Sequence, residues 1–251
     1  MLAGGRSVRM GRAKAALEWH GSTLLARTVR AVARAVDGPV VVVRAAGQRL
    51  PSLPPGVDVL EDEQVGLGPL HGMAVGLAAV RADRAFVTAT DAPFLHPVFV
   101  RRVVAALEDF DVALPVARGF QQPLAAAYAT SLAPLVGSLV ADGRLKPAFL
   151  FEHCRVVRLD EATLLADPAL VAVDPELESL VNVNEPADYE AALTRPAPLV
   201  TVYPGPVTVA AWTIAEAADA LSLTSYAATL DGRPAPDPLT PLSPGDTLHL
   251  G

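Results

Sequence analysis

The beginning of the chain combines a glycine-rich turn with positive charge. Residues 2–11 read Leu-Ala-Gly-Gly-Arg-Ser-Val-Arg-Met-Gly, and Lys14 follows three positions later. The adjacent glycines Gly4 and Gly5 allow the backbone to turn sharply, so that its N–H groups can approach an anion. Arg9 and Lys14 supply positive charge to neutralise a triphosphate and a departing pyrophosphate. The segment therefore predicts a phosphate-binding site, and a purely structural glycine turn is the alternative.

The composition favours a specific role for the rare lysines and asparagines. The chain has 20 lysines and arginines, but its only lysines are Lys14 and Lys146, and its only asparagines are Asn182 and Asn184. A lysine ammonium is a compact point charge and a guanidinium is a planar fork, so the two do not interchange at a tight phosphate site. The loop is not of the Walker type, because Gly-Lys-Ser/Thr does not occur.

Two carboxylates each follow a predicted strand. Asp91 comes directly after residues 85–90, and Asp62 comes directly after residues 57–61. Since the carboxyl ends of parallel strands form the ligand-binding edge of a sheet, Asp91 is predicted to hold Mg²⁺ against phosphate oxygens. Asp62, ahead of the glycine-rich loop 66–72, is predicted to accept hydrogen bonds from a ribose or base. The alternatives are a helix-capping aspartate and an ordinary glycine-rich turn into a helix.

Strand-like and helix-like segments alternate over residues 1–195. This alternation predicts an α/β fold with a doubly wound, mostly parallel sheet and helices on both faces. The predicted strands are residues 40–44, 57–61, 85–90, 112–116 and 155–159. The predicted helices are residues 22–36, 72–80, 97–108, 131–141 and 147–153.

The proline-rich break Arg195-Pro-Ala-Pro198 predicts a domain boundary. Beyond it, a hairpin, a helix over 214–221 with Thr213 as its N-cap, and further strands fall within about fifty residues. This order predicts a small β-grasp-like domain over residues 199–251.

Composition also excludes several classes of protein. The net charge of −7 argues against a general nucleic-acid binder, and no apolar run approaches the ~20 residues that span a bilayer. The single cysteine, Cys154, provides neither a disulfide framework nor a thiolate metal cluster. His-Glu-x-x-His and Gly-x-Ser-x-Gly are absent, and the five histidines show no ligand spacing. We expect a cytoplasmic protein whose partners include neither nucleic acid nor membrane.

The motifs occur in an order that resembles the molybdenum cofactor guanylyltransferase family over residues 1–193. Related enzymes that transfer CMP usually carry Leu-Ala-Ala-Gly at the loop and lack the paired asparagines, so the resemblance favours GTP over CTP. The motifs that carry it are the glycine-rich loop with Lys14, Glu61-Asp62, Gly68-Pro-Leu70, Asp91-x-Pro93, Gln122-Pro-Leu124 through Tyr128, and Val181-Asn-Val-Asn-x-Pro186.

The resemblance implies a magnesium-dependent enzyme that binds GTP and molybdenum-molybdopterin. The terminal phosphate of molybdopterin would attack the α-phosphorus of GTP and expel pyrophosphate. Asn182 and Asn184 are implied to bind the pterin-side substrate, and Arg144 and Lys146 either reach the same pocket or lie in a solvated loop. The implied GTP contacts are Leu2, Ala3, Gly4, Lys14 and Asp62, with Asp91 on Mg²⁺.

The sequence departs from this family in two places. Members usually have a strand of about six apolar residues before the glycine-rich loop, whereas here only Met1 precedes Leu2. We therefore expect a gap in the middle of the sheet and a native start upstream of Met1. The loop 44–47 reads Arg-Ala-Ala-Gly and lacks the asparagine that the family often has there, so one nucleotide contact is expected to be lost or replaced.

The segment from Leu199 onward resembles the ubiquitin-like sulfur carriers of the molybdopterin and thiamin pathways. Those carriers end in a flexible Gly-Gly, whereas this chain stops at Gly251. We expect it to dock another protein of the molybdenum cofactor pathway, or to stabilise the enzyme, rather than to deliver sulfur. For the whole chain, the alternatives are CMP transfer to molybdopterin, a sugar-1-phosphate nucleotidyltransferase, and a catalytically silent GTP-binding scaffold.

Overall fold

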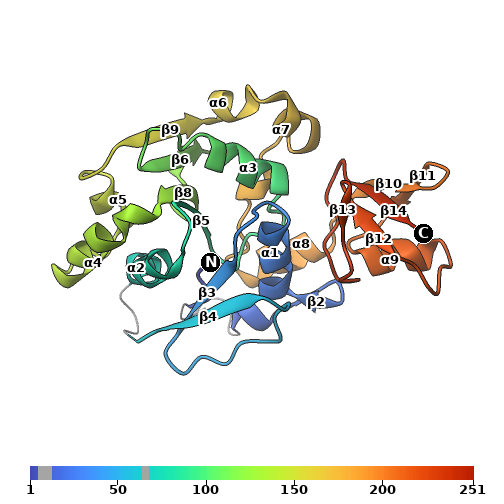
Figure 1. Ribbon diagram of the computed structural model, residues 1–251, viewed down its shortest axis with the longest axis horizontal. Coiled ribbons are helices and arrows are strands. Elements are labelled where there is room, and N and C mark those ends of the chain that lie inside the picture. Colours follow the sequence, from blue (N-terminus) through green and yellow to red (C-terminus); the bar gives the residue numbers. More distant parts are fainter. Residues whose placement is uncertain (5–12, 64–67) are drawn as a thin grey trace.

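The computed structural model describes residues 1–4, 13–63 and 68–251, so the predicted site residues Gly5 and Arg9 lie outside the described part (Figure 1). A larger α/β part, blue to light orange in Figure 1, lies beside a smaller part, drawn in red, that contains the last strands. Within the described ranges, no helix is both long and apolar enough to cross a membrane.

The larger part contains parallel strands, as the alternating pattern predicts. One parallel pair is β3–β4, and the others run in the order β5-β8-β6-β9, with β6–β9 parallel and β8 antiparallel to both of its neighbours. A short strand β7 (Phe120–Gln121) extends the hairpin after β6. The bounds are β3 Val40–Ala45, β4 Val57–Asp62, β5 Arg84–Thr88, β6 Val112–Ala117, β8 Ala125–Ala129 and β9 Val156–Asp160.

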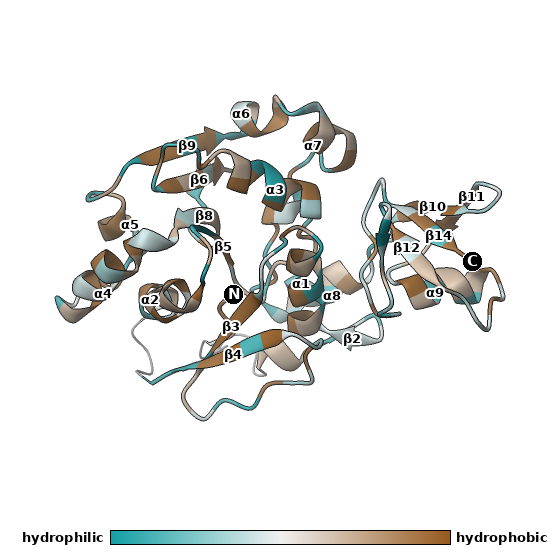
Figure 2. Ribbon diagram, viewed as in Figure 1, coloured by the Kyte–Doolittle hydropathy of each residue, from teal (hydrophilic) through white to brown (hydrophobic). Residues whose placement is uncertain are grey.

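Helices cover both faces of this sheet. Because successive residues of a strand point to opposite faces, β3 contributes side chains to the core on each side. Along β3, Val40 and Val42 pack into the core with α1 and α3, whereas Val41 and Val43 pack into the core with α2 and α4. Figure 2 shows β3 as mainly hydrophobic, and its first four residues are buried valines, as expected of a strand covered on both faces. The helix bounds are α1 Leu24–Ala33, α2 Pro69–Ala79, α3 Pro97–Ala105 and α4 Ala133–Ala141.

Residues Met1 to Ala3 join the two halves of the sheet. Leu2 forms parallel bridges with both Val43 and Ala89. Beyond this short connection, the edges of β3 and β5 flank a cavity of ≈ 450 Å³ whose lining includes Met1, Val41 and Phe86. The Met1 amino group donates to the Val41 carbonyl at 2.7 Å, and burial lowers the pKa of that amine to about 5.

Shorter elements surround the sheet. A hairpin of β1 (Glu18–Trp19) and β2 (Ser22–Thr23) precedes α1. The remaining helices of the larger part are α5 Pro147–Leu150, α6 Glu161–Leu165, α7 Pro168–Val173 and α8 Pro186–Leu193, with 3₁₀ turns at Lys14–Ala16, Thr130–Leu132 and Glu178–Leu180.

The C-terminal segment builds its own sheet and its own core. The strand order is β11-β10-β14-β12-β13, in which β10 and β14 are parallel and the other neighbours are antiparallel. The β-grasp assignment, the boundary at 195–198 and the likeness to sulfur carriers stay predictions. The elements are β10 Leu199–Tyr203, β11 Val207–Ala210, α9 Ile214–Ala220, β12 Ala228–Leu230, β13 Arg233–Pro234 and β14 Thr247–Leu250.

Candidate active site

Three of the predicted site residues meet at one point. Nζ of Lys14 lies 2.9 Å from Oδ2 of Asp91 and 3.0 Å from Oδ1 of Asn184. The three residues are distant in sequence: Lys14 starts a 3₁₀ turn, Asp91 follows β5, and Asn184 lies just before α8. The Lys14 and Asp91 side chains are 18% and 20% exposed, so a ligand can still reach them. The charged cluster is therefore partly open to solvent at the carboxyl end of β5.

The turn that carries Asp91 is fixed from two sides. The backbone N–H of Val183 donates to the Asp91 carbonyl at 2.8 Å, which joins this turn to the loop of Asn184. From α1, Nε of Arg27 donates to the Pro93 carbonyl at 2.6 Å. Because these two hydrogen bonds hold the carbonyls of Asp91 and Pro93, the course of the backbone at Asp91 is set by the fold.

The start of the predicted phosphate-binding loop is anchored between β3 and β5. The N–H of Leu2 donates to the Thr88 carbonyl, and that of Ala3 to the Val43 carbonyl, each at 2.8 Å. A Cβ at Gly4 would lie 3.2 Å from the Ala45 nitrogen, closer than ordinary van der Waals contact. Glycine at this position therefore allows the chain to pass close to the backbone of β3, while the approach of this turn to an anion stays a prediction.

Gln48 holds the same loop to the end of β3. Its amide nitrogen donates to the Ala3 carbonyl at 2.9 Å, and its amide oxygen accepts from the Ala45 N–H at 3.0 Å. In the sequence, residues 44–47 indicate only a missing asparagine. The role of Gln48 could not be predicted, because nothing in the local pattern shows that a glutamine amide bridges two segments that lie 42 residues apart.

Asp62 lies at the end of β4, as predicted, and pairs with a histidine of α2. Oδ1 of Asp62 lies 2.5 Å from Nδ1 of His71. A Cβ at Gly72 would lie 3.1 Å from Cδ2 of Leu2 and 3.9 Å from Oδ2 of Asp62, so α2 passes close to both residues. The sequence gives no ligand spacing for its five histidines, so no role is predicted for His71. Its position directly after the Gly68-Pro-Leu70 motif is the one feature of the sequence that could have indicated a role near the site.

The remaining candidates are placed less tightly. Asn182 and Asn184 are exposed on either side of the buried Val183, so both side chains are open to solvent. Arg144 and Lys146 are also exposed. The carbonyl of the residue between them would lie 3.5 Å from a Cβ at Gly68, so their loop lies beside the start of α2.

The donor set fits a divalent cation that arrives with a nucleotide. Within residues 1–4, 13–63 and 68–251, no group of three or more histidine, cysteine, aspartate or glutamate side chains is arranged to hold a metal ion. Asp91 offers a single carboxylate. Mg²⁺ in nucleotide sites is commonly held by one or two carboxylates together with waters and phosphate oxygens, so one carboxylate suffices there.

Comparisons with known proteins agree with this geometry. The family model "MobA-like NTP transferase domain" matches residues 1–157. A Methanosarcina mazei protein named probable molybdenum cofactor guanylyltransferase is 32% identical over 204 residues, which cover 76% of this chain and 87% of the relative. A Mycobacterium tuberculosis protein of the same name is 38% identical over 199 residues, which cover 77% of this chain and 91% of the relative.

A solved structure shows the same fold. Molybdopterin-guanine dinucleotide biosynthesis protein A from Archaeoglobus fulgidus matches with a TM-score of 0.55 at 22% identity, over 76% of this chain and 94% of that one. At this identity the likeness concerns the fold alone. Because the family model spans more than half of the sequence and includes Lys14, Asp62 and Asp91, the chain belongs to the MobA-like NTP transferase family.

Proposed function

We propose that this chain transfers GMP from GTP to the terminal phosphate of molybdenum-molybdopterin. The guanine dinucleotide form of the cofactor and pyrophosphate are the products. The convergence of Lys14, Asp91 and Asn184 beside the anchored loop carries the proposal. Family membership and the names of the relatives support it.

The reaction is a displacement at phosphorus. An oxygen of the molybdopterin phosphate forms a new bond to the α-phosphorus of GTP, and the bond from that phosphorus to the bridging oxygen of the β-phosphate breaks. Such a transfer requires alignment and charge neutralisation, with little covalent work from the protein. No protein nucleophile is therefore assigned.

Lys14 and Asp91 have complementary roles in this proposal. Asp91 holds Mg²⁺, which when bound neutralises phosphate oxygens. The Lys14 ammonium, now paired with Asp91, turns toward the phosphates and stabilises the negative charge that develops on the departing pyrophosphate. Arg9 is proposed to assist from the same loop.

The remaining residues bind and orient the two substrates. The backbone of Leu2, Ala3, Gly4 and Gly5 receives the phosphates of GTP, and Asp62 accepts hydrogen bonds from its ribose or base. Asn182 and Asn184 orient the molybdopterin phosphate. We further propose a cytoplasmic setting in which the C-terminal sheet docks other proteins of the molybdenum cofactor pathway.

Transfer of label from [α-³²P]GTP to molybdopterin with Mg²⁺ tests the proposal. We expect label in the dinucleotide product with GTP, and much less with CTP or ATP. Transfer from CTP alone would favour the cytidylyl alternative. Binding of GTP without any transfer, while molybdopterin is present and intact, would favour the silent scaffold.

A further inference from the structure

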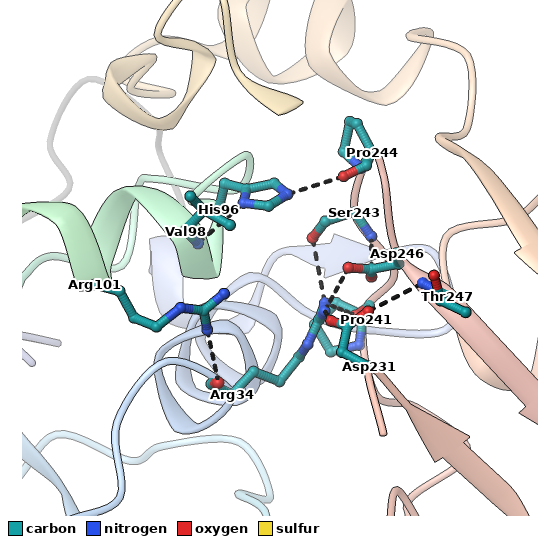
Figure 3. A network of polar contacts seen from close by, with 10 residues as sticks. All are labelled: Arg34, His96, Val98, Arg101, Asp231, Pro241, Ser243, Pro244, Asp246 and Thr247. Atoms are coloured by element: carbon teal, nitrogen blue, oxygen red, sulfur yellow. Dashed lines mark hydrogen bonds and ion pairs between the residues drawn. The ribbon is translucent and has the colours of Figure 1, made fainter. Parts of the chain in front are cut away.

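The C-terminal sheet contacts the helix that supports the Asp91 turn. Figure 3 shows Arg34, at the end of α1, reaching the loop before β14. Its guanidinium lies 2.6 Å from a carboxylate oxygen of Asp246 and donates to the Pro241 carbonyl at 2.7 Å. One turn earlier, Arg30 pairs with Asp237 at 2.7 Å. Helix α1 is therefore fixed to the C-terminal part along one side.

A second contact lies nearer the site and is aromatic. Trp212 of the C-terminal part is 7% exposed, and its ring stacks on His20 in the β1–β2 hairpin with centroids 4.4 Å apart and planes 14° apart. Its ring also meets Trp19 edge-on at 6.1 Å. Stacked and edge-on rings at these distances attract one another. The hairpin between Lys14 and α1 is thus covered by a residue of the connection between β11 and α9.

Arg27 joins Trp212 to the Asp91 turn. The Arg27 guanidinium carbon lies 5.1 Å above the Trp212 ring and 5.7 Å above the Trp19 ring, while its Nε donates to the Pro93 carbonyl. Among the described residues, no carboxylate forms an ion pair with Arg27, and the residue is only 7% exposed. The two tryptophan faces and the Pro93 carbonyl contact this buried cation directly, and the more distant Glu216 and Asp246 carboxylates also favour its charged form.

The packing around Trp19 also reaches the segments that carry Lys14 and Asn184. Trp19 packs with Leu17 and with Val183, which precedes Asn184 and donates to the Asp91 carbonyl. Leu17 follows the 3₁₀ turn that begins at Lys14. Lys14, Asp91 and Asn184 therefore all lie on segments that contact Trp19 or the residues packed around it.

We propose that Trp212 is a positioning residue for nucleotidyl transfer, acting through Arg27 and Trp19 on the segments that carry Asp91 and Lys14. The inference rests on the proposed function. It makes the C-terminal part of the chain a part of the working enzyme, because a ring from the connection between β11 and α9 packs on residues that hold the segments of the site. The ring touches no substrate in this proposal.

The test compares Trp212→Ala and Trp212→Phe with Leu230→Ala in the full chain. Leu230 is buried in the core of the C-terminal sheet and packs among residues of that sheet, so its truncation destabilises the sheet without removing the aromatic contact. We expect Trp212→Ala to lower kcat by roughly tenfold or more with KM for GTP within about threefold, since small misplacements of reacting groups reduce rate steeply. Trp212→Phe should recover most of the rate, and Leu230→Ala should keep it.

Hydrogen–deuterium exchange provides a readout that does not need the reaction. Each variant is measured at the same number of degrees below its own melting temperature. Peptides that cover residues 14–24 and 88–95 should then exchange faster in Trp212→Ala than in Leu230→Ala. Unchanged exchange in those peptides overturns the inference even if guanylyl transfer is established. Faster exchange with no transfer by the wild-type chain would instead defeat the proposed function and leave the positional coupling standing. Equal losses of kcat in Trp212→Ala and Leu230→Ala would also overturn the inference that Trp212 is a positioning residue.

Discussion

Nζ of Lys14 lies 2.9 Å from Oδ2 of Asp91, so the proposed phosphate-binding cation and the proposed metal ligand are ion-paired with each other. In the proposed function the pair opens when a metal ion and a triphosphate enter, because the metal ion competes with the ammonium for the Asp91 carboxylate. The ammonium then interacts with phosphate. The pair thus keeps both groups in place and balances their charges before the substrate binds.

Removal of either charge should reduce turnover strongly. We expect Lys14→Ala and Asp91→Ala each to lower guanylyl transfer by ~100-fold or more, because the first removes a positive charge that stabilises the transition state and the second removes the ligand that holds the metal ion. Lys14→Arg should not restore it, since the planar guanidinium is a poor substitute for a compact ammonium. Steady-state kinetics on purified variants provide the measurement, with Arg233→Ala, at an exposed side chain, as the control. Near-normal turnover in either alanine variant would refute its assigned role.

The same ion pair predicts an effect on metal binding without nucleotide. Lys14→Ala should bind Mg²⁺ or Mn²⁺ more tightly than the wild-type chain, because the ammonium no longer competes for the Asp91 carboxylate. Calorimetric titration with the metal alone measures this. Weaker binding in the variant would argue that Asp91 is not the metal ligand.

Asn184 and Asn182 should differ in their effects. Asn184 accepts a hydrogen bond from the Lys14 ammonium at 3.0 Å, so Asn184→Ala should lower kcat by about tenfold, the usual scale of one hydrogen bond to a charged group. Asn182 is exposed on the same loop, and Asn182→Ala should chiefly raise KM for molybdopterin. Identical kinetic effects of the two variants would contradict this separation.

Two of the ion pairs between the region at the end of α1 and the C-terminal part, Arg34–Asp246 and Arg233–Asp37, should contribute very differently to stability. The Arg34 and Asp246 side chains are 13% and 3% exposed, so Arg34→Ala leaves a buried carboxylate unpaired, at a cost on the order of 3 kcal/mol. The Arg233 and Asp37 side chains are 71% and 89% exposed, and Arg233→Ala should leave stability unchanged. Urea unfolding compares them, and equal free energies of unfolding for both variants would be incompatible with the described contact.

Stability should fall in mild acid through His96. Its Nδ1 accepts from the Val98 N–H, capping α3, and its Nε2 lies 3.1 Å from the Pro244 carbonyl, so the neutral ring with a proton on Nε2 satisfies both. Burial lowers the pKa of His96 below 6.5, with Arg34 and Arg101 acting in the same direction, while the Pro244 contact and the Asp174 carboxylate oppose the shift.

The sign of this effect follows from linkage. Because the unfolded chain binds the proton more readily, this contribution to stability is present above pH 6.5 and is lost as the pH falls from 6.5 through the lower pKa of the folded state. Melting temperature against pH, compared between the wild-type chain and His96→Asn, isolates the effect from that of the other histidines. An equally steep decline in the variant would show that His96 is not responsible.

Much of the fold and part of the site could be predicted from the sequence. Alternating patterns located the strands that end in Asp62 and near Asp91, and chain order then placed both at one edge of the sheet. Strand β8 was not predicted. Its sequence, Ala-Ala-Ala-Tyr-Ala, has little β-propensity, and its burial between β5 and β6 overrides that preference.

The contacts that could not be predicted are those between distant segments. Gln48 on Ala3, His71 on Asp62 and Trp212 on His20 depend on tertiary placement, and no local spacing encodes them. By contrast, the meeting of Lys14, Asp91 and Asn184 was implied only by the family resemblance. Residue types and periodicity could indicate a phosphate-binding loop and a carboxylate at the end of a strand. They could not indicate that Asn184 lies beside both.

The central claim is that the N-terminal loop and an Asp91-held cation jointly bind GTP. Calorimetric titration of the wild-type chain and of Asp91→Ala with GTP, CTP and ATP, each with Mg²⁺, tests it most directly. We expect the wild-type chain to bind GTP in preference to CTP and ATP, and Asp91→Ala to lose most of this Mg²⁺-dependent affinity. No heat of binding with GTP, or affinity in Asp91→Ala equal to wild type, would contradict it.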